Sequence, residues 1–584
     1  MEFADAADKP VFFFKIHGTP FDFRVTSFEA IEAISSPFQI NVTVVCETAI
    51  PFEKVAGMGA VLTVRTKDLT ADGGNRYFHG MVSKLKLVEQ APDGCVYRIR
   101  LLPAIWRLSL EQDCRIFQNT TVQSIIKTIL EESCITSDMF SFALVDSELN
   151  CSYCVQYNET DLNFISRLME EEGLLYFFEH HEDKHVLTIC DDSFFCPDIH
   201  GEPVLQIKSS HGMAQDAETV SAFNLSCRLA TDCVTTRSFS YEHPSYRPGA
   251  VKCSRRETRA EMYEYIGAFV SDKREERLAK ARLGEHAALE KRAKGESNCP
   301  RLSAGHRFDL ESFSGELVGK YVVAAMEHVG DQPQALKGSV GGCAQYWNGF
   351  IAIPEDAHFK PSRITPKPVI AGMQTAMVTG PAGEEIYHDD LGRVKVQFHW
   401  DRQGEMNERS SCWLRYAQGW GGAGWGMQFI PRVGDEVLVA FIDGDPDRPI
   451  IVGSLYNAEN LPLYDPQNKY SVSTIKTRSY PKGDQDNFHE LRFDDRKGSE
   501  ELYLRSERDW NILVKNDKVE TIGNDTSVVV GKSLKIEAGA SVEIVCGASS
   551  ITMDSSGFVT IKGTSINITG SDLIGLTSVR INLN

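Results

Sequence analysis

The chain has 584 residues, of which 42% are hydrophobic and 24% charged, a composition typical of a folded globular protein rather than of a disordered chain. Its formal net charge is −20, which argues against binding to a nucleic-acid backbone or to an anionic membrane surface, because both need clustered Lys and Arg. The length predicts about three to five domains.

The start of the chain does not predict export by the Sec route. MEFADAADKPVFFFKIHG is acidic before a short apolar run, whereas a Sec signal needs a basic start and a longer apolar core. No stretch reaches the roughly 18 uninterrupted apolar residues that a transmembrane helix requires. We therefore expect a protein that folds in the cytoplasm, has no stable membrane insertion and leaves the cell, if at all, by another route.

Residues 1–370 alternate β-like runs, such as FFFKIHG and FDFRVTSFEA, with a few helices. Residues 121–132 and 161–172 carry apolar side chains at helical spacing, and LLYFFEH then predicts a strand. A third, charge-laced helix is predicted over 271–293, with a solvent-facing surface. Two candidate N-caps and one candidate C-terminal stop mark the helix ends: Thr121, Thr160 and Gly173.

The 15 cysteines are scattered along the chain, which is typical of a reducing compartment rather than of a disulfide framework. The one CxxC motif, Cys151 with Cys154, runs on into a strand-like sequence, whereas a redox CxxC should open a helix. A zinc site is the alternative, and the nearby candidate ligands are His180, His181 and His185. We favour reduced, partly buried cysteines and predict no metal and no cofactor.

Three prolines in FKPSRITPKPVIAG (residues 359–372) predict a linker into a new domain. Five β-runs follow over residues 373–465, namely TAMVTG, RVKVQFHW, SCWLRYA, EVLVAFI and PIIVGSLY. Short strands at this spacing predict a small barrel.

A glycine motif within this barrel imitates a dinucleotide-binding loop. GWGGAGWGMQFIPRVGDEV, over residues 419–437, fits the pattern GxGxxG. The pyrophosphate in such a site needs a helix that begins at the third glycine, but Gly426, Pro431 and Gly434 interrupt one. The stretch therefore predicts a structural loop between strands, in which Trp420 and Trp425 pack and the glycines take positive φ.

Two acidic clusters are candidates for chemistry, and both favour a structural interpretation. DGDPDR, with Asp443, Asp445 and Asp447, begins like a calcium loop but lacks its glycine and its bidentate glutamate, so we interpret it as a loop of solvated acids. The run Glu170 to Glu172 could hold a glycosidase carboxylate pair, but it lies near the end of an amphipathic helix, on what we expect to be its wet face. No catalytic residue is predicted.

The C-terminal region is an internal repeat with a period of eight residues, and it is the most informative feature of the chain. Glycines that we interpret as corners recur at Gly523, Gly531, Gly539 and Gly547. The side chains predicted to face inward alternate along the repeat and are Val528, Val530, Leu534, Ile536, Val542, Ile544, Ile551, Met553, Val559, Ile561, Ile566 and Ile568.

Each octad supplies about one strand and one corner, too little to enclose a core within one chain. Three chains side by side can close a triangular prism, in which the charged side chains lie outside and the strand edges pair between subunits. The alternative is an ordinary antiparallel sheet, in which the regular glycine spacing would be accidental.

These residues together resemble the valine–glycine repeat protein G (VgrG) family, the spike of the type VI secretion system, which is similar to the hub and needle of contractile phage tails. The resemblance covers essentially the whole chain. The stretches that carry it are YNETDLNFISRLMEEEGLLYFFEH, GESNCPRLSAGHRFDL, GEEIYHDDLGRVKVQFHWDRQG, SCWLRYAQGWGGAGWGMQFIPRVGDEVLVAFIDGDPDRPIIVGSLYNAENLP and HELRFDDRKGSEELYLRSERD.

The resemblance implies an α+β fold class that is mainly β with some α. It implies a phage-hub-like base of two barrel-like subdomains over 1–370, an oligomer-binding (OB) fold barrel over 373–465, a neck over 466–519 and an intertwined trimeric β-helix needle over 520–584. The chain would act as the homotrimeric tip that punctures target envelopes, without enzymatic activity.

The partners that the resemblance implies are a hexameric tube protein and baseplate proteins at the base, and effectors with a capping protein of the proline–alanine–alanine–arginine (PAAR) repeat type at the tip. The tip residues are Val579, Ile581 and Leu583. The protein would fold in the cytoplasm of a Gram-negative bacterium and then be secreted outside or into target cells. The alternative function is a β-helical carbohydrate-active enzyme, for which a monomer is expected, or an adhesin, for which an export signal is expected.

Overall fold

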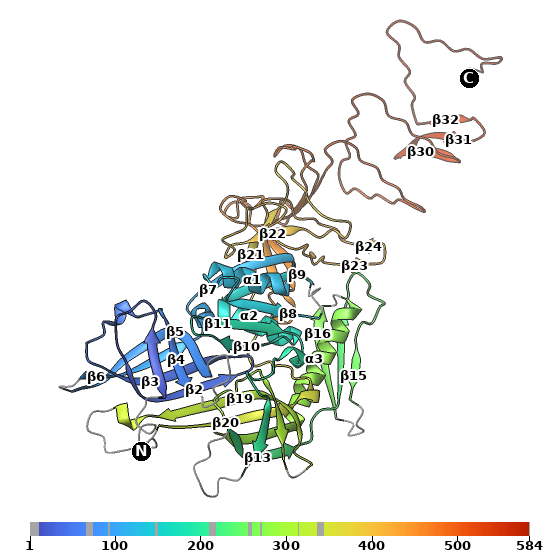
Figure 1. Cartoon of the computed structure of the whole chain (residues 1–584). Coiled ribbons are helices and arrows are strands. Elements are labelled where there is room, and N and C mark those ends of the chain that lie inside the picture. Colours follow the sequence, from blue (N-terminus) through green and yellow to red (C-terminus); the bar gives the residue numbers. More distant parts are fainter. Residues whose placement is uncertain are drawn as a thin grey trace, which may run out of the picture. The chain divides into compact units, whose positions relative to one another are not determined.

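A computed structural model describes residues 11–65, 74–91, 94–145, 150–208, 218–254, 260–268, 271–312, 315–335 and 344–582 (Figure 1). The chain divides into two units, Met1–Leu504 and Arg505–Asn584, and each is described by itself. Among the described residues, strands are the main regular structure of both units, as the sequence predicts.

The largest sheet of the first unit has twelve strands and closes on itself twice. The order β1-β4-β5-β6-β3-β2 is closed by pairing of β1 with β2, and the order β19-β18-β12-β13-β17-β20 is closed by pairing of β19 with β20. Pairing of β2 with β19 joins the two rings. The strands are β1 Phe12–Ile16, β2 Arg24–Ala33, β3 Ser36–Cys46, β4 Gly59–Arg65, β5 Asn75–Ala91, β6 Gly94–Leu102, β12 Val204–Ile207, β13 Thr219–Cys227, β17 Lys291–Ser297, β18 Arg307–Glu311, β19 Gly319–Asp331 and β20 Gln345–Pro354.

Alternation of apolar and polar residues gives each ring a buried interior. In β3 the side chains of Phe38, Ile40 and Val42 are fully buried at every second position, as expected for a strand with one face toward a core. The second ring has its own core, which includes Phe308, Tyr321 and Phe350. The two barrel-like parts inferred from the resemblance are therefore present as two closed rings of strands.

The first two helices form where the sequence predicts them. Helix α1 spans Val122–Glu132, and the Thr121 hydroxyl accepts a hydrogen bond from the Ser124 amide. Helix α2 spans Asp161–Glu172; Thr160 caps it in the same way, and Gly173 ends it with a φ of 71°.

Helix α3 differs from the prediction in length and in environment. It spans Asp272–Glu290, because the next residues, Lys291–Ser297, form β17 of the second ring. One side of the helix is buried rather than solvent-facing, and its buried members include Leu278, Ala281 and Arg282. Charged residues occur on all sides of this helix. Because Arg282 is itself buried, the sequence pattern does not reveal the buried side.

Three smaller sheets complete the N-terminal part of this unit. One places β11 (His185–Cys190) between β10 (Leu175–His180) and β8 (Phe140–Ala143), and another pairs β7 (Gln112–Thr121) with β9 (Asn150–Thr160). The third places β14 (Cys233–Phe239) between β15 (Val251–Cys253) and β16 (Glu261–Ala268).

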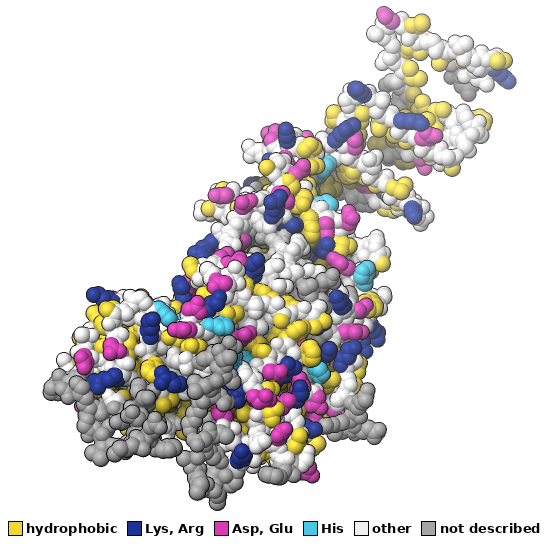
Figure 2. All heavy atoms as spheres, viewed as in Figure 1, with side chains coloured by type: hydrophobic (Ala, Val, Ile, Leu, Met, Phe, Trp, Pro, Cys, Tyr) yellow, Lys and Arg dark blue, Asp and Glu magenta, His cyan; other side chains and the backbone are white. Residues whose placement is uncertain are grey.

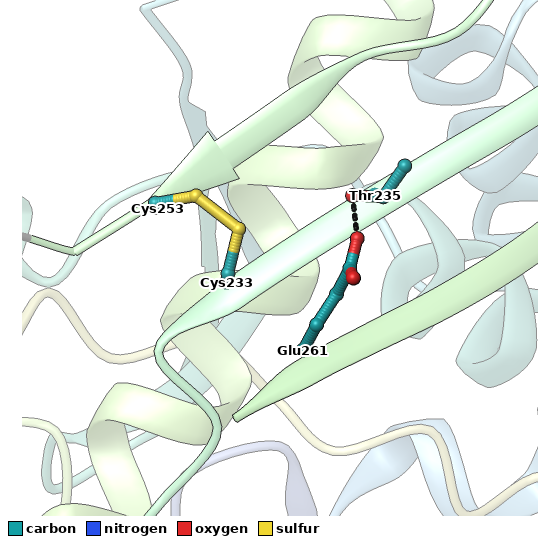
Figure 3. Close-up of a disulfide and its surroundings, with 4 residues drawn as sticks. All are labelled: Cys233, Thr235, Cys253 and Glu261. Atoms are coloured by element: carbon teal, nitrogen blue, oxygen red, sulfur yellow. Dashed lines mark hydrogen bonds between the residues drawn. A yellow bond between two sulfur atoms is a disulfide. The ribbon is translucent and has the colours of Figure 1, made fainter. Parts of the chain in front are cut away.

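A disulfide joins two strands of this third sheet. Figure 3 shows the bond between Cys233 on β14 and the directly opposed Cys253 on β15, beside the hydrogen bond from the Thr235 hydroxyl to Glu261. The expectation that the cysteines are reduced is therefore wrong for this pair, whose opposed positions cannot be seen in the spacing of the sequence. The other described cysteines are free.

The predicted small barrel contains a four-stranded sheet in the order β22-β21-β25-β26. SCWLRYA was expected to be a full strand, but it forms only single bridges, from Leu414 to Val394 beside β22 and from Tyr416 to Ile451 on β26. These bridges connect the two edge strands and close the barrel. The strands are β21 Gln374–Thr379, β22 Lys395–Phe398, β25 Glu436–Phe441 and β26 Pro449–Leu455.

The glycine motif forms a hairpin, as the sequence predicts, and no helix follows it. Its strands are β23 (Gly421–Gly422) and β24 (Trp425–Gly426). Gly426 has a φ of 134°, and an added Cβ there would lie 2.4 Å from the Trp420 carbonyl oxygen, so glycine is required.

The remaining elements are short. Three strands follow the barrel, β27 Val472–Lys476, β28 Glu490–Asp494 and β29 Glu501–Arg505, and three lie further along, β30 Ser541–Cys546, β31 Ser549–Asp554 and β32 Val559–Lys562. The 3-10 turns are η1 Phe52–Lys54, η2 Ala104–Ser109, η3 Ser193–Phe195, η4 Pro333–Ala335, η5 Glu355–Ala357 and η6 Ile442–Gly444.

Of the helices in the described part of the chain, none combines the length and apolar character that a bilayer span demands.

Candidate functional site

The C-terminal unit contains an apolar sheet face whose side chains are largely exposed among the described residues of the single chain. Strands β30, β31 and β32 form an antiparallel meander in which Val542 lies opposite Met553, and Met553 opposite Val559. Ile544, Ile551 and Ile561 align in the same way two residues along. Because side chains two positions apart share a face, six of the predicted core residues lie on one face of this sheet.

Residues 506–540 and 563–582, on either side of this meander, form no regular strand, and their large apolar side chains are exposed. Val528 is 69% exposed, Leu534 65% and Ile536 69%. Figure 2 shows hydrophobic side chains on the surface of this part of the molecule. The predicted core positions outside the meander that are exposed in the single chain are Val528, Val530, Leu534, Ile536, Ile566 and Ile568. Exposed apolar surface of this extent marks a site of association.

The predicted corner glycines lie in different surroundings in the single chain. Gly547 lies in the turn between β30 and β31 and has a φ of 55°. A Cβ added to Gly523, Gly531 or Gly539 would meet nothing within 4 Å in the single chain. The tip residues Val579 and Ile581 are exposed, and Leu583 lies outside the described residues.

The predicted linker, residues 359–372, packs against other elements of the first unit, and we call it the strap. Glu170 of α2, which is buried, accepts hydrogen bonds from the amides of Ile364 and Thr365 at 2.9 Å and from the Thr365 hydroxyl at 2.8 Å. Arg363 pairs through both Nη atoms with the carboxylate of Glu264 on β16. The strap therefore connects the hub to the barrel through charge-assisted hydrogen bonds.

The two acidic clusters also take part in this junction, which corrects their interpretation as solvated surfaces. Lys367 of the strap lies 2.7 Å from the carboxylates of both Asp445 and Asp447. Glu172 is buried and pairs with Arg274 and Arg277 of α3. These partners come from elements that are far apart in the sequence, so the charge pattern at the end of the helix does not reveal them.

A cavity of about 510 Å³ lies at this junction. Charged side chains dominate its lining, among them Arg282, Glu264 and Arg363. Arg282 donates to the backbone carbonyls of Glu170 and Glu171, while Arg363 binds Glu264. Because its charged groups bind one another and the strap, the cavity serves the connection between elements.

A second polar cluster is buried where the strands of the two rings meet. Glu32 on β2 lies 3.1 Å from Arg76, 3.0 Å from Nε2 of His180 and 3.2 Å from Nε2 of His328. Burial alone would raise the pKa of Glu32, but Arg76 and the two imidazoles outweigh it and hold the pKa well below its usual range. Burial lowers the pKa of His180 and of His328. Nε2 of His328 is hydrogen-bonded to the Glu32 carboxylate, and Nε2 of His180 lies within ion-pair distance of it.

The cluster continues to two further histidines. Nδ1 of His180 accepts a hydrogen bond from the His79 amide at 3.1 Å, and Nδ1 of His79 lies 2.9 Å from Nδ1 of His185. Nε2 of His185 accepts from the Ala104 amide, so His185 donates from Nδ1 to His79. Burial lowers the pKa of His79 to about 4, and neighbouring His180 and His17 add to the effect.

The candidate cysteines and the candidate histidines lie on separate elements of the fold. Cys151 and Cys154 lie on strand β9, as the sequence predicts, and no disulfide joins them. His180 and His185 belong to the buried cluster, whereas His181 is exposed. No group of three or more His, Cys, Asp or Glu side chains in the described part of the chain is arranged to hold a metal ion.

Three stretches of the chain match known protein families. Residues 31–334 match the phage tail baseplate hub (GPD) family. Residues 382–456 match the type VI secretion system/phage-baseplate injector OB domain. Residues 473–573 match the bacteriophage T4 gp5 C-terminal trimerisation domain. The matches follow the order of ringed hub, small barrel and apolar C-terminal segment.

Similar proteins with curated descriptions include the type VI secretion system spike protein VgrG5 of Pseudomonas aeruginosa, which is 37% identical over 539 residues, or 89% of this chain and 66% of that protein. The spike protein VgrG1a of the same bacterium is 34% identical over 85% of this chain and 77% of that protein. The chain thus spans about two thirds of the length of several curated relatives.

The fold also resembles that of a solved structure, the E. coli c3393 protein, which is described as a component of the type VI secretion system with structural similarity to the T4 bacteriophage tail proteins gp27 and gp5. The TM-score is 0.53 at 22% sequence identity, and the match covers 76% of this chain and 99% of that one.

Proposed function

Because the chain belongs to the VgrG family of type VI secretion system spike proteins, we propose that three copies of it assemble into a spike with a hub base and a needle. The observation that carries this proposal is the exposed apolar face of β30, β31 and β32, which lies within the match to a trimerisation domain. Three such faces can bury one another around a common axis, and the strand edges can then pair between subunits.

The proposed division of labour follows the chain. Residues 1–370 form the base, 373–465 the OB-fold barrel, 466–519 the neck and 520–584 the needle. In the trimer, Val528, Leu534, Ile536 and the other predicted inward residues fill the needle. What supports these assignments is the two closed strand rings, the closed small barrel and the apolar C-terminal segment.

We further propose how the two ends of the spike are used. The base docks on a hexameric tube protein and on baseplate proteins, and the tip, at Val579, Ile581 and Leu583, contacts a PAAR-type capping protein and carries effectors. The protein folds in the cytoplasm and is then secreted to the exterior or into target cells. The net charge of −20 fits this role without nucleic-acid binding or stable membrane insertion.

The proposed action is mechanical, and the chain itself breaks no chemical bond. The acidic side chains that could have formed a catalytic pair, Glu170 and Glu172, instead hold the strap and α3. Trimer interlocking would give resistance to unfolding under load, because unfolding must separate chains that pair over long sequence distances.

The proposal is tested by the mass of the particle and by its secretion. Multi-angle light scattering on the purified full chain should give three times the chain mass of 65.1 kDa. Deletion of the gene should stop release of the tube protein into the medium, and a plasmid copy should restore it. A monomer would contradict the proposed spike.

A further inference from the structure

The barrel carries a projecting hairpin, residues 419–429, which we call the Trp hairpin. Its short strands pair Gly421 with Gly426 and Gly422 with Trp425. The Met427 amide donates to the Trp420 carbonyl at 2.8 Å, which extends the pairing by one more bond. The hairpin therefore has a defined backbone and is not a loose loop.

Side-chain bonds hold the base of the Trp hairpin in place. The side-chain amide nitrogen of Gln418 donates to the Phe429 carbonyl at 2.9 Å. The backbone amide of Phe429 donates to the side-chain oxygen of Gln418 at 2.9 Å. A Cβ on Gly422 would lie 2.4 Å from the Trp425 ring, so only glycine lets this indole lie against the backbone. The shape of the hairpin is thus fixed before any partner arrives.

This rigid element exposes four large apolar side chains. Trp420 is 60% exposed, Trp425 57%, Met427 52% and Phe429 49%. The two indoles contact each other edge to face, with ring centroids 4.9 Å apart. Tryptophans held in one conformation lose little entropy on binding, and such residues dominate the energetics of protein interfaces.

The residues that directly follow the Trp hairpin contact the stretch that matches the trimerisation domain. Arg432, three residues after the hairpin, donates from Nη2 to the carbonyl of Arg478 at 2.7 Å. Glu385, which pairs with Arg432, also accepts from the Lys482 amide at 2.8 Å. Arg478 and Lys482 belong to the match with the trimerisation domain, so the hairpin is continuous with that interface.

We propose that the Trp hairpin of each copy packs against the barrel or neck of a neighbouring copy and forms a second trimer contact outside the needle. This inference rests on the proposed homotrimer and adds to it a specific contact at the level of the barrel. The contact buries the indoles of Trp420 and Trp425 and locks adjacent barrels together. Loads that reach the needle are then shared by a second interface.

Photo-crosslinking in the full chain tests the contact directly. Trp425 is replaced by the photoreactive residue p-benzoylphenylalanine, the protein is irradiated, and the products are separated on a denaturing gel. A contact with another copy should give a band at twice the 65.1 kDa chain mass. The matched control places the same residue at Phe194, an exposed aromatic position of the hub.

Each outcome decides between the inference and the proposed function. A monomer in light scattering contradicts the proposed spike itself. A trimer in which position 425 gives no doubled band overturns only the hairpin contact. Bands of equal strength from positions 425 and 194 that fade on dilution show collision between particles, which also overturns it.

A double variant, Trp420→Ala with Trp425→Ala, provides a second measurement. The trimer should still form through the needle, but it should dissociate in denaturant at least tenfold faster than the wild type. Trp347→Ala, which removes an exposed tryptophan from β20, is the control for loss of an indole. An unchanged rate in a double variant with wild-type circular dichroism would overturn the proposed contact.

Discussion

At the scale of single residues, the buried histidines make hub stability depend on pH. Burial lowers the pKa of His79 to about 4, whereas an unfolded histidine titrates near 6.5. As the pH falls below about 6.5, the unfolded state binds the proton first, so stability is lost from about pH 6.5 down to pH 4. A shift of this size corresponds to roughly 3 kcal/mol. Chemical denaturation at a series of pH values measures it.

The His79→Gln variant separates this residue from the rest of the cluster. It should reduce the slope of unfolding free energy against pH between 5 and 6, because one fewer proton is taken up on unfolding. His185 and His180, whose pKa values burial also lowers, should still contribute to the slope that remains. A variant that keeps the full wild-type slope would show that His79 titrates normally in the fold.

Glu170 gives a prediction about the strap. Glu170→Ala removes the carboxylate that accepts from the amides of Ile364 and Thr365, and each lost hydrogen bond to a charged group is worth about 1.5–3 kcal/mol. The strap should then detach more often, and trypsin should cut after Arg363 at least tenfold faster, because Pro368 protects the bond after Lys367. Mass spectrometry of timed digests measures the rate of cleavage.

The control for this prediction is Glu182→Ala, which removes an exposed glutamate from the turn between β10 and β11. It should leave cleavage of the strap unchanged. If Glu170→Ala also leaves cleavage unchanged, the strap is held by Arg363 and Lys367 rather than by α2.

At the scale of elements, the sequence predicts those that carry their own signals. Helices α1 and α2 have caps, stops and apolar stripes within the segment, so their bounds were predictable. The ends of α3, the strap and the SCWLRYA strand depend on distant partners, such as β17 and Glu170, and were predicted incompletely. The buried Glu32 cluster was missed for the same reason, since its members lie on separate strands.

The octad repeat gives a prediction for the proposed needle. Ile536→Asp should place three carboxylates around one layer of the proposed prism, where burial of unpaired charge is strongly unfavourable. Assembly should fail, and light scattering should report monomer. Ser533→Asp, which adds the same charge at a position outside the inward set, should leave the trimer intact. A trimer of the Ile536→Asp variant would contradict the inward assignment.

At the scale of the whole molecule, the order of hub, barrel and C-terminal segment was predictable, because each part has its own sequence texture. Strand spacing marks the barrel, and the eight-residue glycine period marks the needle. Residues of the repeat such as Ile536 are exposed in the described part of one copy, and this exposed apolar surface points to association.

Removal of residues 520–584 therefore gives a prediction for the assembled spike. The two strand rings and the barrel have their own buried cores, so the shortened chain should keep the near-ultraviolet circular dichroism and the thermal unfolding of the hub. It should lose binding to a PAAR-type capping protein, because the proposed tip residues Val579 and Ile581 are gone. Affinity capture with purified capping protein measures this, and Val579→Asp in the full chain is the matched variant that keeps the needle. Retained binding by the shortened chain would move the capping interface to the barrel or the hub, and loss of the hub transition would show that the base depends on the needle for its stability.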